Sequence, residues 1–429
     1  MTPSGRIAAA IDVLSAIERT HRPTVEALKD WGTAHRFAGA GDRSAIGPLV
    51  HDALRWRASS AFRMGEDTPR ALVIGTLAFR WRRPAAAVEG LFSGERHAPE
   101  PLTAAERTAI AADRLAEAPA PVRADVPDWI APSLEAGFGA AWIAEAEALA
   151  ARAPLDLRTN TLKADREKVL KALERLGARP TPISPLGVRL APGTGFDRSP
   201  NVVREEGYQR GWFEIQDEGS QVCAALAAPA PGEQVLDYCA GAGGKTLALS
   251  AALDNRGQVH AYDADPNQLA PIFERLKRAG TRNVQVHRPD ADLSALEGRM
   301  DRVLVDAPCT GSGTWRRRPD AKWRLSPEAV ARRLAEQRTV LDGAARFVRP
   351  GGRLVYVTCS VLPEENAAQV AAFLGRDDRF RPVPADGPWD ALFGAEVPQP
   401  RPEDRGGLTL TPAATGTDGF FLAILERAA

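Results

Sequence analysis

The sequence contains two apolar runs that each end in a cysteine, DRVLVDAPCTGSG at residues 301–313 and GGRLVYVTCS at residues 351–360. Short continuous runs of Val, Leu and Tyr with Gly or Pro nearby are typical of buried strands in a parallel sheet. Ligands of open α/β sheets bind beyond the carboxyl ends of the strands. We therefore expect Asp306, Cys309 and Cys359 to face one crevice at that edge of the sheet.

Strands and helices alternate regularly from Gln234 onward, which implies a parallel sheet with right-handed crossovers. Two further strands near the end of the chain are joined by a short Gly-containing turn, so we expect them to pair antiparallel. This part of the chain therefore predicts an α/β, Rossmann-like domain. Its predicted strands are 234–239, 259–263, 284–288, 302–306, 353–358, 408–410 and 420–425, and its predicted helices are 246–253, 267–279 and 327–348.

The residues before this domain form two other regions. Up to about residue 126, apolar residues recur at helical spacing, which predicts an all-α bundle. The next hundred residues mix a predicted strand and turn at 155–163 with predicted helices at 134–151 and 166–176, which indicates a small α+β domain. We therefore predict a multidomain protein with boundaries at 1–126, 127–226 and 227–429.

Composition and charge narrow the class of protein. Apolar and charged contents of 44% and 26% are ordinary for a globular protein, and 55 basic residues balance 55 acidic ones. Four cysteines without CxxC spacing and six histidines without an HExxH motif argue against a zinc site and fit a reducing cytoplasm. No signal-peptide core or membrane-length apolar run is present. We expect a cytoplasmic protein without metal or membrane; the oligomeric state is unknown, with a monomer favoured.

A glycine-rich turn follows the first strand of the α/β region in VLDYCAGAGGKT, residues 235–246. Its glycines let the backbone turn tightly and approach a ligand. Asp263 ends the next strand, about twenty residues on, where an acid typically receives ribose hydroxyls, and Asp290 follows the strand after that. The spacing fits neither a phosphate-binding loop nor the dehydrogenase motif. Because the turn is combined with Asp263 and Asp290, we expect an adenosyl ligand. The alternative is that Asp263 only caps the following turn.

The cysteines also have a simple structural interpretation. A single cysteine at a strand end is most often a small buried hydrophobe, and this is what we expect from the residues alone for Cys223 and Cys239. Two cysteines on adjacent strands beside Asp306 favour chemistry instead. Cys359 directly precedes SVLPEEN, which predicts a helix start, and a nearby helix N-terminus favours the thiolate form of a cysteine.

Four segments together resemble the Sun-type (RsmB-like) RNA cytosine-5 methyltransferases: DYCAGAGGKT, AYDADP, DAPCTGSGTWRRRPDAKW and VYVTCSVLPEEN. RTNTLK, IQDEGSQ and TDGFFLA extend the likeness from about Pro127 to the C-terminus. The first region, with RIAAAIDVL and GDRSAIGPLVHDALRW, looks like a NusB-type RNA-binding domain. The resemblance implies a class I methyltransferase domain, S-adenosyl-L-methionine as methyl donor, and RNA, with ribosomal RNA preferred, as acceptor.

The resemblance also implies roles for individual residues. Cys359 would be the nucleophile that adds to cytosine carbon 6, and Cys309 would assist its release. From its position three residues before Cys309, and not from the resemblance, Asp306 is expected to hold the ring edge. The sequence departs from the family where Gly241 and Ala242 replace Ala-Pro, where Pro289 replaces a glycine, and where a histidine before the final GFF is missing. The residues expected to line the donor site are Cys239, Ala240, Gly241, Ala242, Gly243, Gly244, Lys245, Asp263, Asp290 and Asp306.

Three alternatives stay open at this point. The two cysteines could have exchanged roles, with Cys309 as the nucleophile. The acceptor could be transfer RNA. The protein could also be a non-catalytic, RNA-binding ribosome-assembly factor that retains the donor fold for structure. The basic stretch 316–338 and the basic edge of the middle domain fit RNA binding, but a solvated surface explains them equally well.

Overall fold

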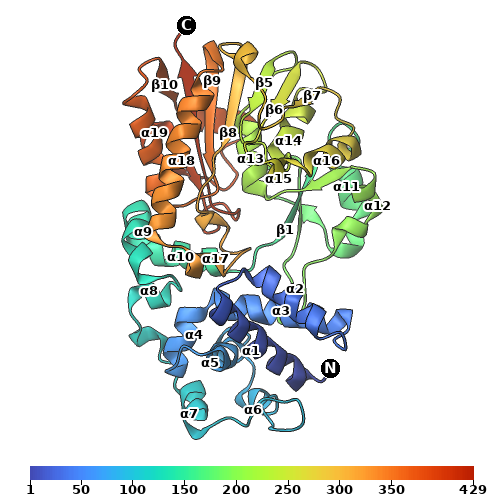
Figure 1. Ribbon diagram of the computed structural model, residues 1–429, viewed down its shortest axis with the longest axis vertical. Helices are drawn as coiled ribbons and strands as arrows, with labels where there is room; N and C mark the ends of the chain where they lie inside the picture. Colours follow the sequence, from blue (N-terminus) through green and yellow to red (C-terminus); the bar gives the residue numbers. More distant parts are fainter. The chain divides into compact units, whose positions relative to one another are not determined.

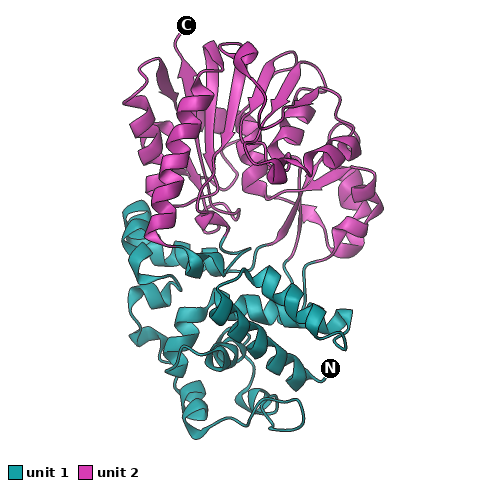
Figure 2. Cartoon of the chain, in the orientation of Figure 1, with its two compact units in different colours: residues 1–153, 192–199, 315–325 teal, residues 154–191, 200–314, 326–429 magenta.

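The computed structural model describes all residues from 1 to 429 (Figure 1). Packing divides the chain into two compact units (Figure 2). Unit 1 comprises residues 1–153, 192–199 and 315–325, and unit 2 comprises residues 154–191, 200–314 and 326–429. This division does not test the boundaries predicted at residues 126 and 226, which stay predictions. None of the helices has both the length and the apolar character needed to cross a lipid bilayer.

Unit 1 is built from helices, as predicted for the first region of the chain. The first helix begins after Thr2, whose hydroxyl accepts a hydrogen bond from the Gly5 N–H. Its apolar face, with Ile7 and Leu14, packs in one core with Leu49 of the third helix. The helices before the middle sheet are α1 (Pro3–Thr20), α2 (Thr24–Ala34), α3 (Ala40–Arg55), α4 (Arg57–Met64), α5 (Pro69–Gly75), α6 (Ala85–Glu89), α7 (Ala104–Ala112), α8 (Ala120–Arg123), α9 (Ala131–Phe138) and α10 (Trp142–Ala150).

Residues 315–325 belong to unit 1 although they follow the Cys309 segment in the sequence. They include the short helix α17 (Ala321–Arg324). Lys322 Nζ donates to the Arg55 carbonyl at 2.8 Å, and Trp323 Nε1 donates to the Leu54 carbonyl at 2.6 Å. In return, Arg55 Nη1 donates to the Arg316 carbonyl at 2.8 Å. These contacts attach the segment to the C-terminal end of α3.

The middle region forms an antiparallel four-stranded sheet of order β2-β3-β1-β4, which confirms the predicted small α+β domain. Asn160, which follows β1, donates to the Ala279 carbonyl at 2.8 Å, and Glu214 of β4 pairs with Arg275 and Arg278. These contacts join the sheet to the helix before β7. The elements are β1 (Leu155–Thr159), α11 (Arg166–Ala172), β2 (Arg179–Pro180), β3 (Gly187–Leu190), α12 (Glu206–Gln209) and β4 (Phe213–Ile215).

The C-terminal sheet has the order β11-β12-β13-β9-β8-β5-β6-β7, with β10 paired to β13. Strands β9, β8, β5, β6 and β7 are parallel and β13 is antiparallel to β12, as predicted. Strand β13 is also antiparallel to β9. The strands are β5 (Gln234–Asp237), β6 (Gln258–Ala261), β7 (Val284–Val286), β8 (Met300–Asp306), β9 (Val348–Thr358), β10 (Phe380–Val383), β11 (Arg401–Pro402), β12 (Leu408–Leu410) and β13 (Phe420–Arg427).

Both faces of this sheet are buried, because side chains alternate along each strand. Val303 and Val305 of β8 pack with residues of α18 and α19, whereas Leu304 packs in a second core with residues of α13 and α14. The continuous apolar runs of the sequence therefore correspond to strands covered on both sides. The helices of this unit are α13 (Glu218–Leu226), α14 (Gly244–Ala252), α15 (Pro266–Leu269), α16 (Ile272–Ala279), α18 (Pro327–Ala345), α19 (Ala367–Leu374) and α20 (Asp386–Phe393).

Two helices that the sequence predicts as continuous are broken, and these predictions were wrong. The helix expected at 134–151 is interrupted between α9 and α10 at Gly139, whose φ of 56° lies outside the helical range. The helix expected at 267–279 is divided into α15 and α16 at Pro271, which has no N–H to donate to the preceding turn. Apolar residues recur at helical spacing on both sides of each break, so the pattern alone predicts a continuous helix.

Candidate functional site

Cys309 and Cys359 lie next to each other beyond the carboxyl ends of two neighbouring strands. Strands β8 and β9 pair in parallel with Asp306 opposite Val357, and each is followed within three residues by one of the cysteines. The two sulfur atoms are 3.4 Å apart, and both side chains are partly exposed. The structure thus brings together the two thiols that the sequence singled out.

A buried carboxylate, Glu365, holds the loops of both cysteines. Its Oε1 accepts from the Thr310 N–H at 2.8 Å and from Gln337 Nε2 at 2.9 Å. Its Oε2 accepts from the Thr310 hydroxyl at 2.6 Å and also from the Ser360 hydroxyl. Thr310 and Ser360 each directly follow a cysteine, so one side chain fixes both loops. The sequence analysis did not identify this residue.

The backbones of the cysteine loops also make direct contact. The Gly313 N–H donates to the Cys359 carbonyl at 3.0 Å, and the Gly419 N–H donates to the Gly313 carbonyl at 2.8 Å. A Cβ atom on Gly313 would lie 2.0 Å from the Gly419 oxygen, so only glycine permits this approach. The loop before β13 therefore supports the cysteine loops from the C-terminal end of the chain.

The surroundings of Cys309 keep its sulfur protonated. Its hydrogen bond with Cys359 contributes most, followed by burial and then by the negative charges of Cys359 and Glu365, and together they raise the pKa of Cys309 well above its usual value. Either sulfur can be the donor in the 3.4 Å contact between Cys309 and Cys359. The raised pKa of Cys309 means that loss of its proton is opposed beside Glu365.

Asp306 and Lys245 connect the cysteines to the glycine-rich turn. Lys245 lies in the first turn of α14, and its Nζ is 2.6 Å from Asp306 Oδ2 at the end of β8. Burial lowers the pKa of Lys245, but the nearby charge of Asp306 more than offsets this, so the pKa is raised overall. The lysine is almost fully buried, whereas about a third of the Asp306 side chain remains exposed. Asp306 can therefore still contact a ligand.

The glycine-rich turn after β5 forms an open backbone surface. Gly241 and Gly243 have φ values of 48° and 84°, which favour glycine. A Cβ on Gly243 would lie 2.5 Å from Ile272, whereas at Gly241 and Gly244 no atom would lie closer than 3.9 Å. The Gly241 N–H donates to Asp263 Oδ2 at 2.8 Å, so the acid at the end of β6 orients the turn.

The other predicted donor residues differ in their positions. Ala240 is buried in the turn, and the Ala242 carbonyl accepts from Arg275 Nη1 at 2.8 Å. Cys239 is partly buried, and burial raises its pKa well above the usual value. Asp290 is exposed and pairs with Arg288 at 3.1 Å. Its ion pair is therefore with Arg288 and not with the turn, and its role in donor binding stays a prediction.

Comparison with known proteins defines the family. A model described as 16S rRNA methyltransferase RsmB/F matches residues 224–426, and one described as the RsmF/B-like ferredoxin-like domain matches residues 126–196. The probable ribosomal RNA small subunit methyltransferase B of Synechocystis is 33% identical over 311 residues, which cover 70% of this chain and 67% of the relative. The enzyme of that name from Salmonella arizonae is 36% identical, covering 70% and 66%.

The chain belongs to the RsmB/F family. This confirms the resemblance seen in the sequence for the middle and C-terminal regions. The matched region spans about two thirds of the relatives' length. Since the family models begin at residue 126, the likeness of the first region to a NusB-type domain stays a prediction.

Solved structures support the same fold. The crystal structure of PH0851 superposes with a TM-score of 0.73 at 25% identity, covering 100% of this chain and 99% of the other. A methyltransferase homolog from Pyrococcus horikoshii has a TM-score of 0.59 at 27% identity, covering 72% and 97%. NSun6 from Pyrococcus horikoshii, solved with SFG, has a TM-score of 0.59 at 21% identity and shows the fold alone. The predicted Rossmann-like and small α+β folds are confirmed.

Proteins of the RsmB/F family use S-adenosylmethionine as methyl donor, and the residues of this chain fit that group. The open positions at Gly241 and Gly244 leave room for a ligand against the backbone. Asp237, at the end of β5, is fully buried, and its Oδ1 has no hydrogen-bond partner. Burial raises the pKa of Asp237 to about 7, although a hydrogen bond from Thr246 opposes this. An unpaired buried oxygen beside an open glycine turn is consistent with a polar ligand.

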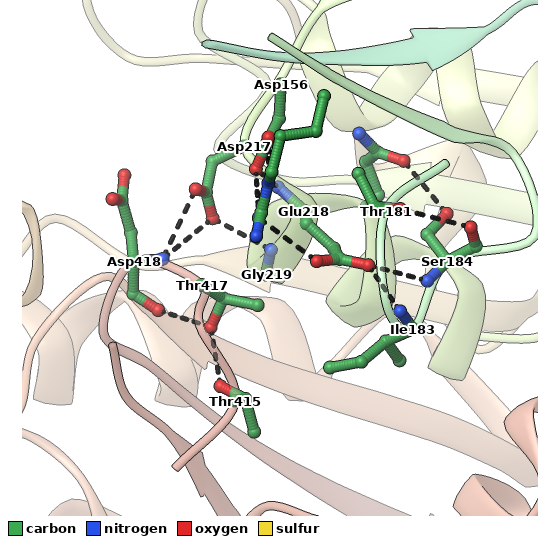
Figure 3. Close-up of polar contacts among 12 residues, drawn as sticks. Asp156, Thr181, Ile183, Ser184, Asp217, Glu218, Gly219, Thr415, Thr417 and Asp418 are labelled. Carbon is green, nitrogen blue, oxygen red and sulfur yellow. Dashed lines mark hydrogen bonds and ion pairs between the residues drawn. The ribbon is translucent and has the colours of Figure 1, made fainter. Parts of the chain in front are cut away.

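A second polar network, around IQDEGSQ, was not recognised from the sequence (Figure 3). Arg189 of β3 donates to both carboxylate oxygens of Asp156 at 2.7 Å and to Glu218 at 3.1 Å. Next to it, Asp217 accepts from the Asp418 N–H at 3.2 Å in the loop before β13. The network thus links the middle sheet to α13 and to the loop that supports the cysteines. The only sign of this network in the sequence was the pair of acids at the start of α13, Asp217 and Glu218.

Proposed function

We propose that this protein is an S-adenosylmethionine-dependent RNA cytosine-5 methyltransferase that acts on ribosomal RNA through a covalent adduct between Cys359 and cytosine carbon 6. The observation that carries the proposal is the 3.4 Å separation of two thiols beside Asp306 and the glycine-rich turn. The family and the names of the relatives support ribosomal RNA as the acceptor. Because ribosomes are assembled in the cytoplasm of bacteria, we place the reaction there.

Cytosine carbon 5 is too weak a nucleophile to attack the methyl group unaided, so the enzyme must first activate the ring with a nucleophile of its own. Addition of the Cys359 thiolate to carbon 6 forms a carbon–sulfur bond and makes carbon 5 electron-rich. The donor would supply an electrophilic methyl group: carbon 5 would bond to that methyl as its bond to the sulfonium sulfur breaks, which would leave the donor as a neutral thioether. Loss of the carbon 5 proton and cleavage of the carbon–sulfur bond then restore the aromatic ring and release the Cys359 thiolate.

The environment of the two cysteines supports this assignment of roles. Cys309 has a raised pKa and is held as a thiol against Cys359. Its S–H can donate a hydrogen bond to the Cys359 sulfur as that sulfur leaves carbon 6, which stabilises the departing thiolate. Exchange of the two roles would require Cys309 to lose its proton beside Glu365, which the negative charge opposes.

Asp306 is suited to hold the cytosine edge. Its carboxylate is partly exposed, and Lys245 fixes its orientation from the buried side. A carboxylate accepts a hydrogen bond from the exocyclic amino group of cytosine but not from the carbonyl oxygen at the same position of uracil. This contact would select cytosine over uracil.

The test compares three single substitutions in the full-length protein. Cys359→Ala should reduce methyl transfer to ribosomal RNA by at least about 1,000-fold, because the nucleophile is lost. Cys309→Ala should slow release and let a covalent protein–RNA adduct accumulate, visible as a shifted band on a denaturing gel. Cys223→Ala is the matched control, since Cys223 is buried in the core between α13 and the sheet.

The outcomes separate the alternatives. Full activity of Cys359→Ala would refute the assignment. An adduct that is lost only with Cys309→Ala would mean that the cysteines have the opposite roles. If the unmodified protein binds ribosomal RNA but transfers no labelled methyl to ribosomal or transfer RNA, the protein is a binding factor and not an enzyme.

A further inference from the structure

A cavity of about 380 Å³ lies in unit 1, and every residue that lines it belongs to this unit. It is formed by α3, the residues after α10 and the inserted segments 192–199 and 315–325. No Phe, Tyr or Trp lines it. Five arginines do: Arg55, Arg152, Arg198, Arg316 and Arg317.

Two of these arginines are held by the buried carboxylate of Asp52. Arg152 donates to it through Nε at 3.0 Å and Nη2 at 2.6 Å, and its remaining N–H groups bond to the Gly193 and Gly195 carbonyls. Arg55 donates to Asp52 through Nε at 3.1 Å. One negative charge thus faces two guanidinium groups, which leaves an excess of positive charge at the floor of the cavity.

Arg55 also has an unused hydrogen-bonding edge. Its Nη1 donates to the carbonyls of Ala150, Ala151 and Arg316 at 2.8–3.2 Å. None of its hydrogen bonds involves Nη2, the other terminal nitrogen. The residue is only 5% exposed, so this free N–H edge faces little water except through the cavity. A cationic N–H donor without a protein acceptor can donate to an anion that enters the cavity.

Arg198 contributes an exposed positive charge to the lining of the cavity. Its side chain is exposed and forms no ion pair; its one hydrogen bond is a long one of 3.4 Å to the Arg43 carbonyl. Its guanidinium lies over Gly47 of α3, where a Cβ atom would come within 3.0 Å of Nη2. The glycine therefore lets this guanidinium lie close to the helix beside the cavity.

We propose that this cavity binds a backbone phosphate of the RNA substrate. Guanidinium groups bind phosphate oxygens through paired N–H donors, and the unused edge of Arg55 and the unpaired Arg198 supply such donors. The absence of aromatic lining favours contact with the backbone over stacking with a base. The lining carries only two acids, Asp52 and Asp197, against the five arginines. The proposal rests on RNA being the substrate, as proposed above.

The experiment measures RNA affinity of the full chain. A fluorescently labelled fragment of 16S rRNA is titrated with the unmodified protein, with Arg198→Glu, and with Arg83→Glu as control. Arg83 is an exposed arginine of unit 1 that does not line the cavity. Arg198→Glu should weaken binding by roughly 10-fold at 0.1 M salt. The slope of log affinity against log salt concentration should become less steep by about 1, the change expected for one lost phosphate contact. The loss should be equal for an unrelated RNA of the same length, and Arg198→Lys should restore part of it.

Equal weakening by Arg198→Glu and Arg83→Glu, or no weakening by either, would overturn the proposal. Measuring the rate of methyl transfer at saturating RNA distinguishes failure of the cavity proposal from failure of the proposed reaction. Arg198→Glu should raise KM for RNA while kcat stays within about twofold of the unmodified protein. If the unmodified protein transfers no methyl group but Arg198→Glu still loses RNA affinity, the cavity assignment survives and the proposed reaction fails.

Discussion

Asp52 in unit 1 and Glu365 in unit 2 are both buried carboxylates, 1% and 0% exposed, but their donors differ in charge. Asp52 accepts from two arginines, Arg55 and Arg152, and from the Trp81 indole at 2.8 Å. Glu365 accepts only from neutral amide, hydroxyl and backbone groups.

The same type of side chain therefore has opposite effects on its surroundings. Around Glu365 the negative charge is not balanced by a cation, and it helps to keep the Cys309 sulfur protonated. Around Asp52 the two cations outnumber the carboxylate and leave donors available to an anion. The partners of a buried charge, more than the charge itself, decide which chemistry a region supports.

The largest expected effect is loss of stability in Asp52→Ala. Removal of the carboxylate leaves two guanidinium groups buried without a counterion, which costs about 3–5 kcal/mol. Urea unfolding measures this loss. Asp67→Ala is the control, because Asp67 pairs with Arg57 at 2.9 Å but is about half exposed, and such pairs contribute about 1 kcal/mol or less. Equal losses in the two variants would show that Asp52 does not neutralise buried charge.

The second prediction concerns Glu365→Gln. The amide keeps the volume, but its NH2 group cannot accept a hydrogen bond, so it cannot replace both oxygens that Glu365 uses as acceptors, and stability should fall by about 1–3 kcal/mol. Removal of the negative charge should also lower the pKa of Cys309 and speed its alkylation at pH 8–9, measured by mass spectrometry. Exposed Glu364→Gln is the matched control. Unchanged alkylation of Cys309 would contradict the electrostatic role given to Glu365.

The smallest expected effect concerns a histidine pair that contains no carboxylate, the buried His260 and the partly exposed His287. It tests how a neutral partner, in place of a carboxylate, affects a buried titratable group. His260 and His287 are 2.9 Å apart, and burial and the neighbouring ring lower the pKa of His260 to about 4. Unfolded histidine has a pKa near 6.5, so the unfolded chain takes up protons first as the pH falls. Stability should be complete above about pH 6.5 and fall by on the order of 1 kcal/mol by pH 5.

The control for this prediction is His260→Gln, which cannot be protonated in that range. Its unfolding free energy should vary less between pH 6.5 and 5 than that of the unmodified protein. An identical pH profile in both proteins would show that the pair does not cause the acid sensitivity.

The sequence predicted the parallel strands and the cysteine pair because both depend on local patterns. The apolar runs around Val303 and Val355 are visible as buried strands, and the alternation of strands with helices predicts that they are parallel. Glu365 was missed because its partners come from three separate segments, at 310, 337 and 360. No spacing rule within one segment indicates such a convergence.

The basic stretch from 316 shows a different limit of sequence reasoning. Its charges fitted either a solvated surface or an RNA-binding surface, yet Arg316 and Lys322 are only 4% and 2% exposed. Burial lowers the pKa of Lys322 to about 7, although the charge of Asp125 opposes this. Charged residues are so rarely buried that composition gives no warning of it.

The position of residues 315–325 in unit 1 has a consequence for how the protein is made. A ribosome releases the first 153 residues long before it reaches Trp315, so the core of α1 and α3 can collapse early. The contacts of Lys322 and Trp323 with the end of α3 must wait until β8 and Cys309 have already left the ribosome. Completion of the N-terminal unit is therefore timed by synthesis of the segment that follows the Cys309 loop.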